Sequence, residues 1–188
     1  MSRVVVPVRS RTVQAFGASA TVRVEGGPAT LVGDAVDRLR ALERCWSPDH
    51  PDGALARLNR SAGIPRVVEP DLFVLVEFLL DRWRATAGWF DPTVRSRGVA
   101  AVTAATVTEP ARVLAPPAEG CAAIRVDADR RMVWAPVGVH LHPRGCERDL
   151  AVRLVTAEVL AAGAAAVDVH LARRPPAPVP ALALAPTG

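Results

Sequence analysis

The densest group of side chains capable of chemistry lies in the segment VHLHPRGCERDL, residues 139–150. His140 and His142 are two residues apart in it, and Arg144 and Arg148 follow closely. Two imidazoles at this spacing face the same side of a β-strand, where they can bind zinc or iron. Arginines favour an anion such as a phosphate instead. The segment therefore predicts either a metal site or a phosphate-binding turn.

A metal centre at the two histidines has no obvious further ligands. The other histidines, His50 and His170, lie in unrelated segments, whereas zinc takes three or four protein ligands. The three cysteines are odd in number and widely spaced, which excludes a CxxC knuckle and a disulfide framework. We therefore expect the histidines of residues 139–150 to be ordinary polar residues of a strand, in a protein of the reducing cytoplasm.

The segment GWFDPTV is the second one with chemical character. Asp91 precedes a proline, which restricts its backbone to an extended conformation, and Thr93 can hydrogen-bond to nearby backbone. The rings of Trp89 and Phe90 can pack on a core or stack on a ligand. Considered alone, the segment is typical of a helix exit packed on the core.

Helices with an apolar stripe are expected to position these segments. Apolar residues recur at spacings of three and four after Pro28 and again between Pro70 and Gly88, which predicts two long amphipathic helices. The sequence predicts a short helix within residues 54–63. A further helix is expected over residues 149–162, before the stop signal of a glycine.

Strands are indicated by alternating apolar residues. Residues 12–27 predict one or two early strands with a flexible point at Gly17. Residues 122–136 predict a hairpin around residues 127–130, and residues 165–172 predict a buried strand. Helices and strands together indicate an α+β fold.

Length and composition favour one compact domain. The chain has 188 residues with 50% hydrophobic and 22% charged residues, enough for a substantial core. The net charge is only +4 and the basic residues are scattered among 19 acids, so we expect no nucleic-acid partner. We also expect no membrane span. The expected organisation is an N-terminal extension (1–12), the domain (13–172) and a Pro/Ala-rich, disordered tail (173–188).

The order of several segments resembles the FAD:protein FMN transferase (ApbE) family. The segments are AFGASATVRV, LRALERCWSPDHPDGALARLNRSAG, ATAGWFDPTV and the long stretch from IRVDADRRMVW to AAVDVHLA. They extend from about Val13 to about Leu171, nearly the whole chain. The resemblance implies an α+β, T-fold-like architecture in which helices pack on mixed, mostly antiparallel sheets, truncated at its C-terminal end relative to the family.

The same resemblance implies a chemistry. Members of the family bind FAD, use Mg²⁺ to cleave its pyrophosphate, and attach FMN through a phosphoester to a threonine of a partner flavoprotein. Trp89, Phe90 and Asp91 match the family's FAD-contacting segment. Phe16 stands where the family has a methionine, and its ring can still pack against a flavin.

Residues 139–150 match the family's nucleotide-binding turn LDLGGIAKG with several replacements. His142 replaces the aspartate and Arg144 replaces a glycine. Gly145 is kept and remains a candidate residue of the metal site. Arg148 replaces the lysine and can hold a phosphate. The resemblance thus makes the opening segment an altered nucleotide-binding turn with His142 and Arg148 as cofactor-binding residues.

A second glycine turn of the family, NLGGD, corresponds to HLARR at residues 170–174. No acidic residue follows Asp168, although a divalent cation needs oxygen ligands. Three hypotheses therefore stay open: a Mg²⁺-dependent transferase that acts on a target flavoprotein, a flavin- or nucleotide-binding pseudoenzyme, and a structural or interaction protein. In the third, a free sheet edge would allow pairing with another chain or a homo-oligomer.

Overall fold

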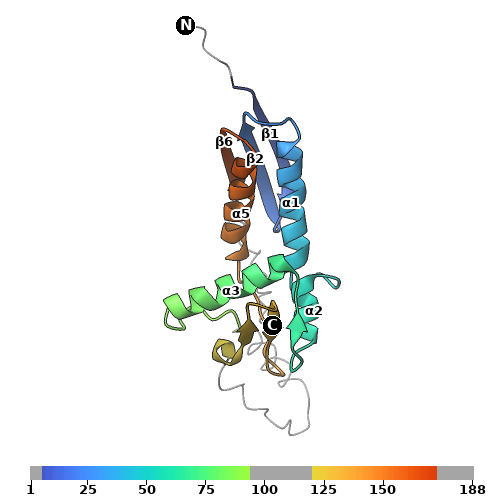
Figure 1. Ribbon diagram of the computed structural model, residues 1–188, viewed down its shortest axis with the longest axis vertical. Helices are drawn as coiled ribbons and strands as arrows, with labels where there is room; N and C mark the ends of the chain where they lie inside the picture. The colour runs from blue at the N-terminus through green and yellow to red at the C-terminus, as the bar shows by residue number, and fades with distance from the viewer. Residues whose placement is uncertain (1–5, 94–119, 173–188) are drawn as a thin grey trace, which may run out of the picture.

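The computed structural model describes residues 6–93 and 120–172. Two parts follow each other along its long axis (Figure 1). One part is a three-stranded sheet with two long helices, and the other combines two helices with a second small sheet. The α+β prediction is confirmed, and every strand pair in the described ranges is antiparallel. The predicted tail, 173–188, lies outside the described residues.

The first sheet has the order β1-β2-β6, formed by β1 (Val8–Ala15), β2 (Ala18–Glu25) and β6 (Ala166–Leu171). The early segment therefore forms two strands in a hairpin, the second of the two possibilities that the alternation left open. Phe16 and Gly17 connect them with φ angles of 53° and 67°, the left-handed pair that a two-residue type I′ turn requires. Because β1 begins at Val8, residues 8–12 pair with β2 and are part of the sheet rather than of an extension.

Two helices, α1 (Leu31–Trp46) and α5 (Glu147–Ala161), lie on the same face of this sheet (Figure 1). The buried residues of α1 recur at spacings of three and four, which explains its position on the core. They are Leu31, Ala35, Val36, Leu39, Leu42 and Trp46. The inward residues of β2 are small or β-branched, namely Ala18, Ala20, Val22 and Val24, so the helices can approach the sheet closely.

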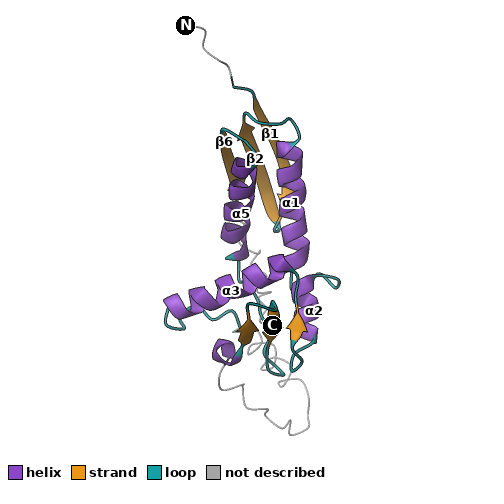
Figure 2. Ribbon diagram, viewed as in Figure 1, coloured by secondary structure: helices purple, strands orange, loops and turns teal. Residues whose placement is uncertain are grey.

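The second part contains α2 (Ala54–Arg60), α3 (Pro70–Ala85) and the short 3₁₀-helix η1 (Gly120–Ala123). Its sheet has the order β3-β5-β4. The strands are β3 (Arg66–Val67), β4 (Arg125–Asp127) and β5 (Met132–Trp134). The predicted hairpin is confirmed as β4 and β5. In the view of Figure 2, α3 runs across the lower end of α1, which it contacts.

One cation joins the three long helices. Arg38 of α1 donates to both carboxylate oxygens of Asp71 on α3, at 2.5 and 2.8 Å, and to Glu158 on α5, at 2.9 to 3.1 Å. These bonds raise the pKa of the guanidinium above its usual value. The Trp46 indole N–H also donates to the Asp71 carbonyl at 2.9 Å. Asp71, in the first turn of α3, therefore fixes the second part against the first.

The expectation of a strand at His140 and His142 is wrong. Residues 138–143 form no strand in the structure, so the two histidines do not share one face of a sheet. The proline at 143 and the left-handed residues that follow it prevent a ladder there. Within the described ranges, no helix combines the length and the apolar character that a membrane crossing needs.

Candidate functional site

The predicted nucleotide-binding turn is a tight loop that leads into α5. Arg144 and Gly145 have φ angles of 59° and 93°. A left-handed conformation costs a non-glycine residue such as Arg144 about 1 kcal/mol. The Arg144 N–H donates to Nδ1 of His142 at 3.1 Å, and the Cys146 N–H donates to the Pro143 carbonyl at 3.2 Å. These local bonds hold the turn in its strained conformation.

Two further hydrogen-bonded connections place the turn next to other segments. The Asn59 amide of α2 accepts from the Leu141 N–H at 2.8 Å and donates to the Leu141 carbonyl at 2.9 Å. The His142 N–H donates to the Pro92 carbonyl at 2.8 Å. The aromatic-Asp-Pro segment and the turn are thus joined directly, although 50 residues separate Pro92 from His142 in the sequence.

The aromatic pair of the first of these segments has two different environments. Trp89 is 95% exposed, so its ring is available to a ligand. Phe90 is half-buried, and its N–H donates to the Thr86 hydroxyl at the end of α3, at 3.0 Å. The Arg82 guanidinium lies over the Phe90 ring, 5.5 Å from its centre, within the range of a cation–π contact.

Asp91 is held by the residue two positions later. One oxygen of its carboxylate accepts from the Thr93 N–H at 2.8 Å and from the Thr93 hydroxyl at 2.6 Å. Thr93 itself is buried. This arrangement is the short local turn that an aspartate side chain forms with backbone two residues later, and it fixes the orientation of the carboxylate.

Two predicted residues point elsewhere. The Arg148 guanidinium donates to the Ala172 carbonyl beyond the end of β6, so it connects α5 to the sheet. Phe16 packs on Trp46, with ring centres 6.3 Å apart.

The carbonyl of Gly145 accepts from the Arg148 N–H at 3.3 Å, and an added Cβ at Gly145 would meet nothing within 4 Å. The turn is therefore open on the side of this glycine.

Burial controls the titrating groups beside the turn. It raises the pKa of the Glu147 carboxyl, and one oxygen of this group is buried without a hydrogen-bond partner among the described residues. Burial, and then the charge of Glu147, raises the pKa of the Cys146 thiol to about 11. Burial and the charge of Asp91 raise the pKa of Cys121 to about 12. Both thiols stay protonated at neutral pH and are poor nucleophiles.

The described residues do not fit a magnesium site. No group of three His, Cys, Asp or Glu side chains in residues 6–93 and 120–172 is arranged to hold a metal ion. The Glu147 carboxylate has one buried oxygen without a hydrogen bond, and Oδ1 of Asp91 already accepts two hydrogen bonds from Thr93. Mg²⁺ requires six ligands in octahedral geometry, and the described residues do not supply such a set.

Sequence reasoning missed three residues of this region. In the sequence, Asn59 stands out only as part of a longer motif. The available signal for it is a polar amide beside the apolar residues of a short helix. Glu147 lies within the turn segment, but its residue type alone does not indicate that it is buried. Arg82 lies among other charged residues at the end of α3, and nothing in the sequence distinguishes it from them.

The ApbE family model matches residues 16–166. Several solved structures share the fold. The apo form of the Pseudomonas stutzeri flavinyl transferase ApbE has a TM-score of 0.70 at 19% identity, over 91% of this chain and 60% of that chain. The ApbE protein of Thermotoga maritima has a TM-score of 0.69 at 17% identity, over 88% and 57% of the two chains.

The flavin transferase ApbE of Vibrio cholerae has a TM-score of 0.65 at 15% identity, over 87% of this chain and 57% of that chain. At these identities the likeness establishes the fold alone. The chain spans about three fifths of the length of these structures. Among curated proteins, none matches the sequence.

Proposed function

The chain belongs to the ApbE family, and from this premise we propose that it is an FAD:protein FMN transferase-like protein that binds FAD beside the turn at residues 139–148. The observation that supports the proposal best is the 2.8 Å hydrogen bond from the His142 N–H to the Pro92 carbonyl. Because of this bond, the Phe90–Asp91 segment and the Arg144–Gly145 turn can contact the same ligand.

The side chains near this bond suit the two halves of a flavin dinucleotide. The exposed Trp89 ring offers a stacking surface for an aromatic heterocycle. Arg144, exposed in the turn, and the open side of Gly145 suit a pyrophosphate, which arginine binds through paired N–H donors. Asp91 is fixed by Thr93 and can accept from a ring N–H or a hydroxyl of the ligand. Phe16 and Arg148 remain candidates from the family resemblance alone.

The transfer itself would form a bond between a threonine hydroxyl of a target flavoprotein and the phosphorus of the FMN half of FAD. The P–O bond of the pyrophosphate would break, AMP would leave, and the hydroxyl proton would pass to solvent. This chain's own contribution would be to hold and orient the dinucleotide, and such positioning is one of the two main sources of catalysis in phosphoryl transfer, with electrostatic stabilisation the other.

FAD binding without transfer is the second candidate function. The observation that favours it is the lack of a metal-binding group of side chains among the described residues. In this case the turn would retain intact FAD.

Fluorescence titration tests FAD binding. We expect saturable quenching of FAD fluorescence by the purified protein. Arg144→Glu should weaken binding about tenfold, since it reverses a charge beside the proposed pyrophosphate. Arg153→Glu makes the same charge change on the exposed surface of α5 and should leave binding unchanged. Absence of quenching, or equal effects of the two variants, would contradict the proposal.

Mass spectrometry separates the two candidate functions. The protein is incubated with FAD, Mg²⁺ and a target flavoprotein segment that contains an acceptor threonine. A covalent FMN increment on the segment supports transfer. FAD binding without an increment supports the second candidate.

A further inference from the structure

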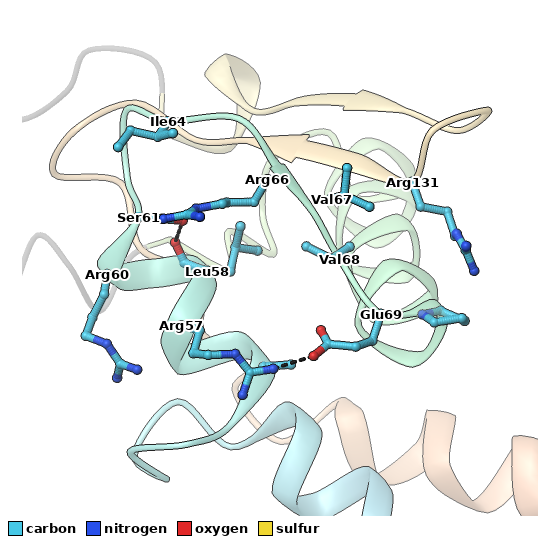
Figure 3. Close-up of a pocket in the computed structure, with 12 residues that line it drawn as sticks. Arg57, Leu58, Arg60, Ser61, Ile64, Arg66, Val67, Val68, Glu69 and Arg131 are labelled. Carbon is cyan, nitrogen blue, oxygen red and sulfur yellow. Dashed lines mark hydrogen bonds and ion pairs between the residues drawn. The ribbon is translucent and has the colours of Figure 1, made fainter.

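A cavity of about 710 Å³ lies between α2 and the segment that leads through β3 into α3 (Figure 3). None of the residues that the sequence predicted for the flavin site lines it. Four arginines and a single carboxylate do, namely Arg57, Arg60, Arg66, Arg131 and Glu69. A cavity of this size can hold a small molecule or a short peptide segment, and its charge favours an anion.

The four arginines differ in how their charge is satisfied. Arg57 pairs with Glu69 and donates to the Asp52 carbonyl. Arg60 donates to the Pro51 carbonyl at 2.8 Å. Within residues 6–93 and 120–172, Arg66 and Arg131 have neither an ion pair nor a side-chain hydrogen bond. Two cations of the cavity are therefore held in position by the protein, and two are available to a ligand.

Arg131 occupies a backbone position that does not favour arginine. It has a φ angle of 49° at the end of the β4–β5 turn, where glycine or asparagine avoids the steric cost. Its carbonyl accepts from the Val68 N–H at 3.0 Å, which fixes the turn beside the cavity. In Figure 3, Arg131 lies on the side of the cavity opposite Arg60, with Arg66 between them.

The cavity also has a strand edge that is unpaired among residues 6–93 and 120–172. Within these ranges β3 pairs with β5 on one side and with no strand on the other. Because the Val68 N–H bonds to Arg131, and bonded and non-bonded pairs alternate in an antiparallel ladder, the Val67–Met132 pair is non-bonded. The backbone N–H and C=O of Val67 therefore point away from β5, at the free edge.

Apolar side chains are exposed on the same surface. Val67 is 70% exposed and Ile64 is 57% exposed, and both line the cavity. Leu58 and Val68 are buried and also line it. A free backbone edge, exposed aliphatic side chains and available arginines together match an extended peptide that alternates carboxylates with apolar residues, because strand addition uses all three.

We propose that this cavity binds an extended acidic segment of another protein, which adds to the free edge of β3 and pairs its carboxylates with Arg66 and Arg131. The chain's own remaining segments lack the charge for this role. Residues 1–5 and 173–188 contain no acidic residue, and residues 94–119 contain only Glu109 and Glu119. The proposal concerns a different surface from the flavin site and does not depend on it.

Fluorescence anisotropy with the full chain tests this binding. The probe is a fluorescein-labelled octapeptide in which glutamate alternates with valine, and its control replaces every glutamate with lysine. We expect saturable binding of the first peptide alone, weakened by added salt. No saturable binding up to about 1 mM, or equal binding of both peptides, would overturn the proposal.

Variants locate the site. The double variant Arg66→Glu with Arg131→Glu should weaken binding of the acidic peptide about tenfold. Arg153→Glu should change it less than twofold, because this exposed residue of α5 does not line the cavity. Arg66→Glu with Arg131→Gly is a second version that removes the strained residue and guards against misfolding. Equal losses from the α5 control and the cavity variants would overturn the proposal.

Two further measurements test the strand addition. Two peptides are methylated on every second backbone nitrogen, one at the odd and the other at the even residues. One of the two should bind more weakly than the unmethylated peptide, because edge pairing needs the N–H groups on one side of the peptide. Inorganic tripolyphosphate, added so that its total charge equals that of the peptide, should displace the peptide poorly. Unchanged binding of both methylated peptides, or full displacement by tripolyphosphate, would instead indicate a site for small anions.

Discussion

The turn at residues 139–148 and the cavity beside β3 adjoin different faces of the short helix α2, and they differ in how their polar groups are satisfied. At the turn, the Asn59 amide, Nδ1 of His142 and the Arg148 guanidinium all bond to backbone groups of the protein. At the cavity, Arg66 and Arg131 have no such partner within the described ranges. Family resemblance therefore points to the first region, and unsatisfied charge points to the second.

This difference predicts opposite effects of mutation. Residues whose polar groups are satisfied internally should contribute to stability, and their loss should unfold the protein more easily. Residues that await a ligand should contribute little to stability and much to binding. Each prediction below tests this contrast.

Asn59→Leu should have the largest effect on stability. It removes both hydrogen bonds to Leu141 and leaves the backbone N–H and C=O of that residue without partners. We expect a loss of about 2–3 kcal/mol in the free energy of unfolding, measured by urea denaturation. Asn59→Asp keeps the acceptor for the Leu141 N–H and should lose less. Equal losses would show that the bond from the Leu141 N–H to the side-chain oxygen of residue 59 contributes nothing.

Arg38→Met should have the second-largest effect on stability. Arg38 bonds to Asp71 and Glu158, but its side chain is 28% exposed, so solvent screens part of the gain. We expect a loss of about 1–2 kcal/mol. The same change at Arg66 should stay within about 0.5 kcal/mol, the usual range of a surface substitution. Similar losses at the two arginines, by urea denaturation, would remove the contrast.

Arg131→Gly should stabilise the protein slightly. Relief of the φ angle of 49° should outweigh the entropy cost of glycine by about 0.5 kcal/mol. Arg131→Ala removes the same guanidinium but keeps Cβ, so it should give no gain in thermal denaturation. A gain with alanine as large as with glycine would mean that backbone strain is not the cause.

Glu147→Gln should have the smallest effect, which is a change in the pH dependence of stability. Burial raises the pKa of this carboxyl above its ordinary value of 4.5, so the folded state holds the proton more tightly than the unfolded state. The wild type should therefore lose stability relative to the glutamine variant as pH rises from below 4.5 through the raised pKa. Urea denaturation at several pH values measures this difference. A constant difference would contradict the role of burial.

Much of the fold could be predicted from the sequence, because periodic apolar residues define long elements. The stripes of α1 and α3 and the alternation in β2 are examples. β3 could not be predicted, since a strand of two residues has no measurable period. The strand expected at His140 was wrong because alternation alone does not account for a proline and two left-handed residues that follow.

The two candidate functional regions also differ in how much of each can be predicted from the sequence. The motif predicted the turn and the aromatic-Asp-Pro segment, but not the backbone bond between Pro92 and His142 that joins them. Nothing in the sequence predicted the cavity, because Arg66 and Arg131 are 65 residues apart and meet only through the pairing of β3 with β5. Periodicity predicts elements, whereas the sites depend on contacts between distant segments.

A titration of ¹⁵N-labelled protein with FAD, followed by amide NMR shifts, tests the central claim most directly. The account predicts that the signals of His142, Arg144 and Gly145 move in a saturable manner while those of Arg66, Val67 and Arg131 stay in place. Shifts confined to the cavity residues, or no saturable shift at the turn, would contradict the assignment of the flavin site.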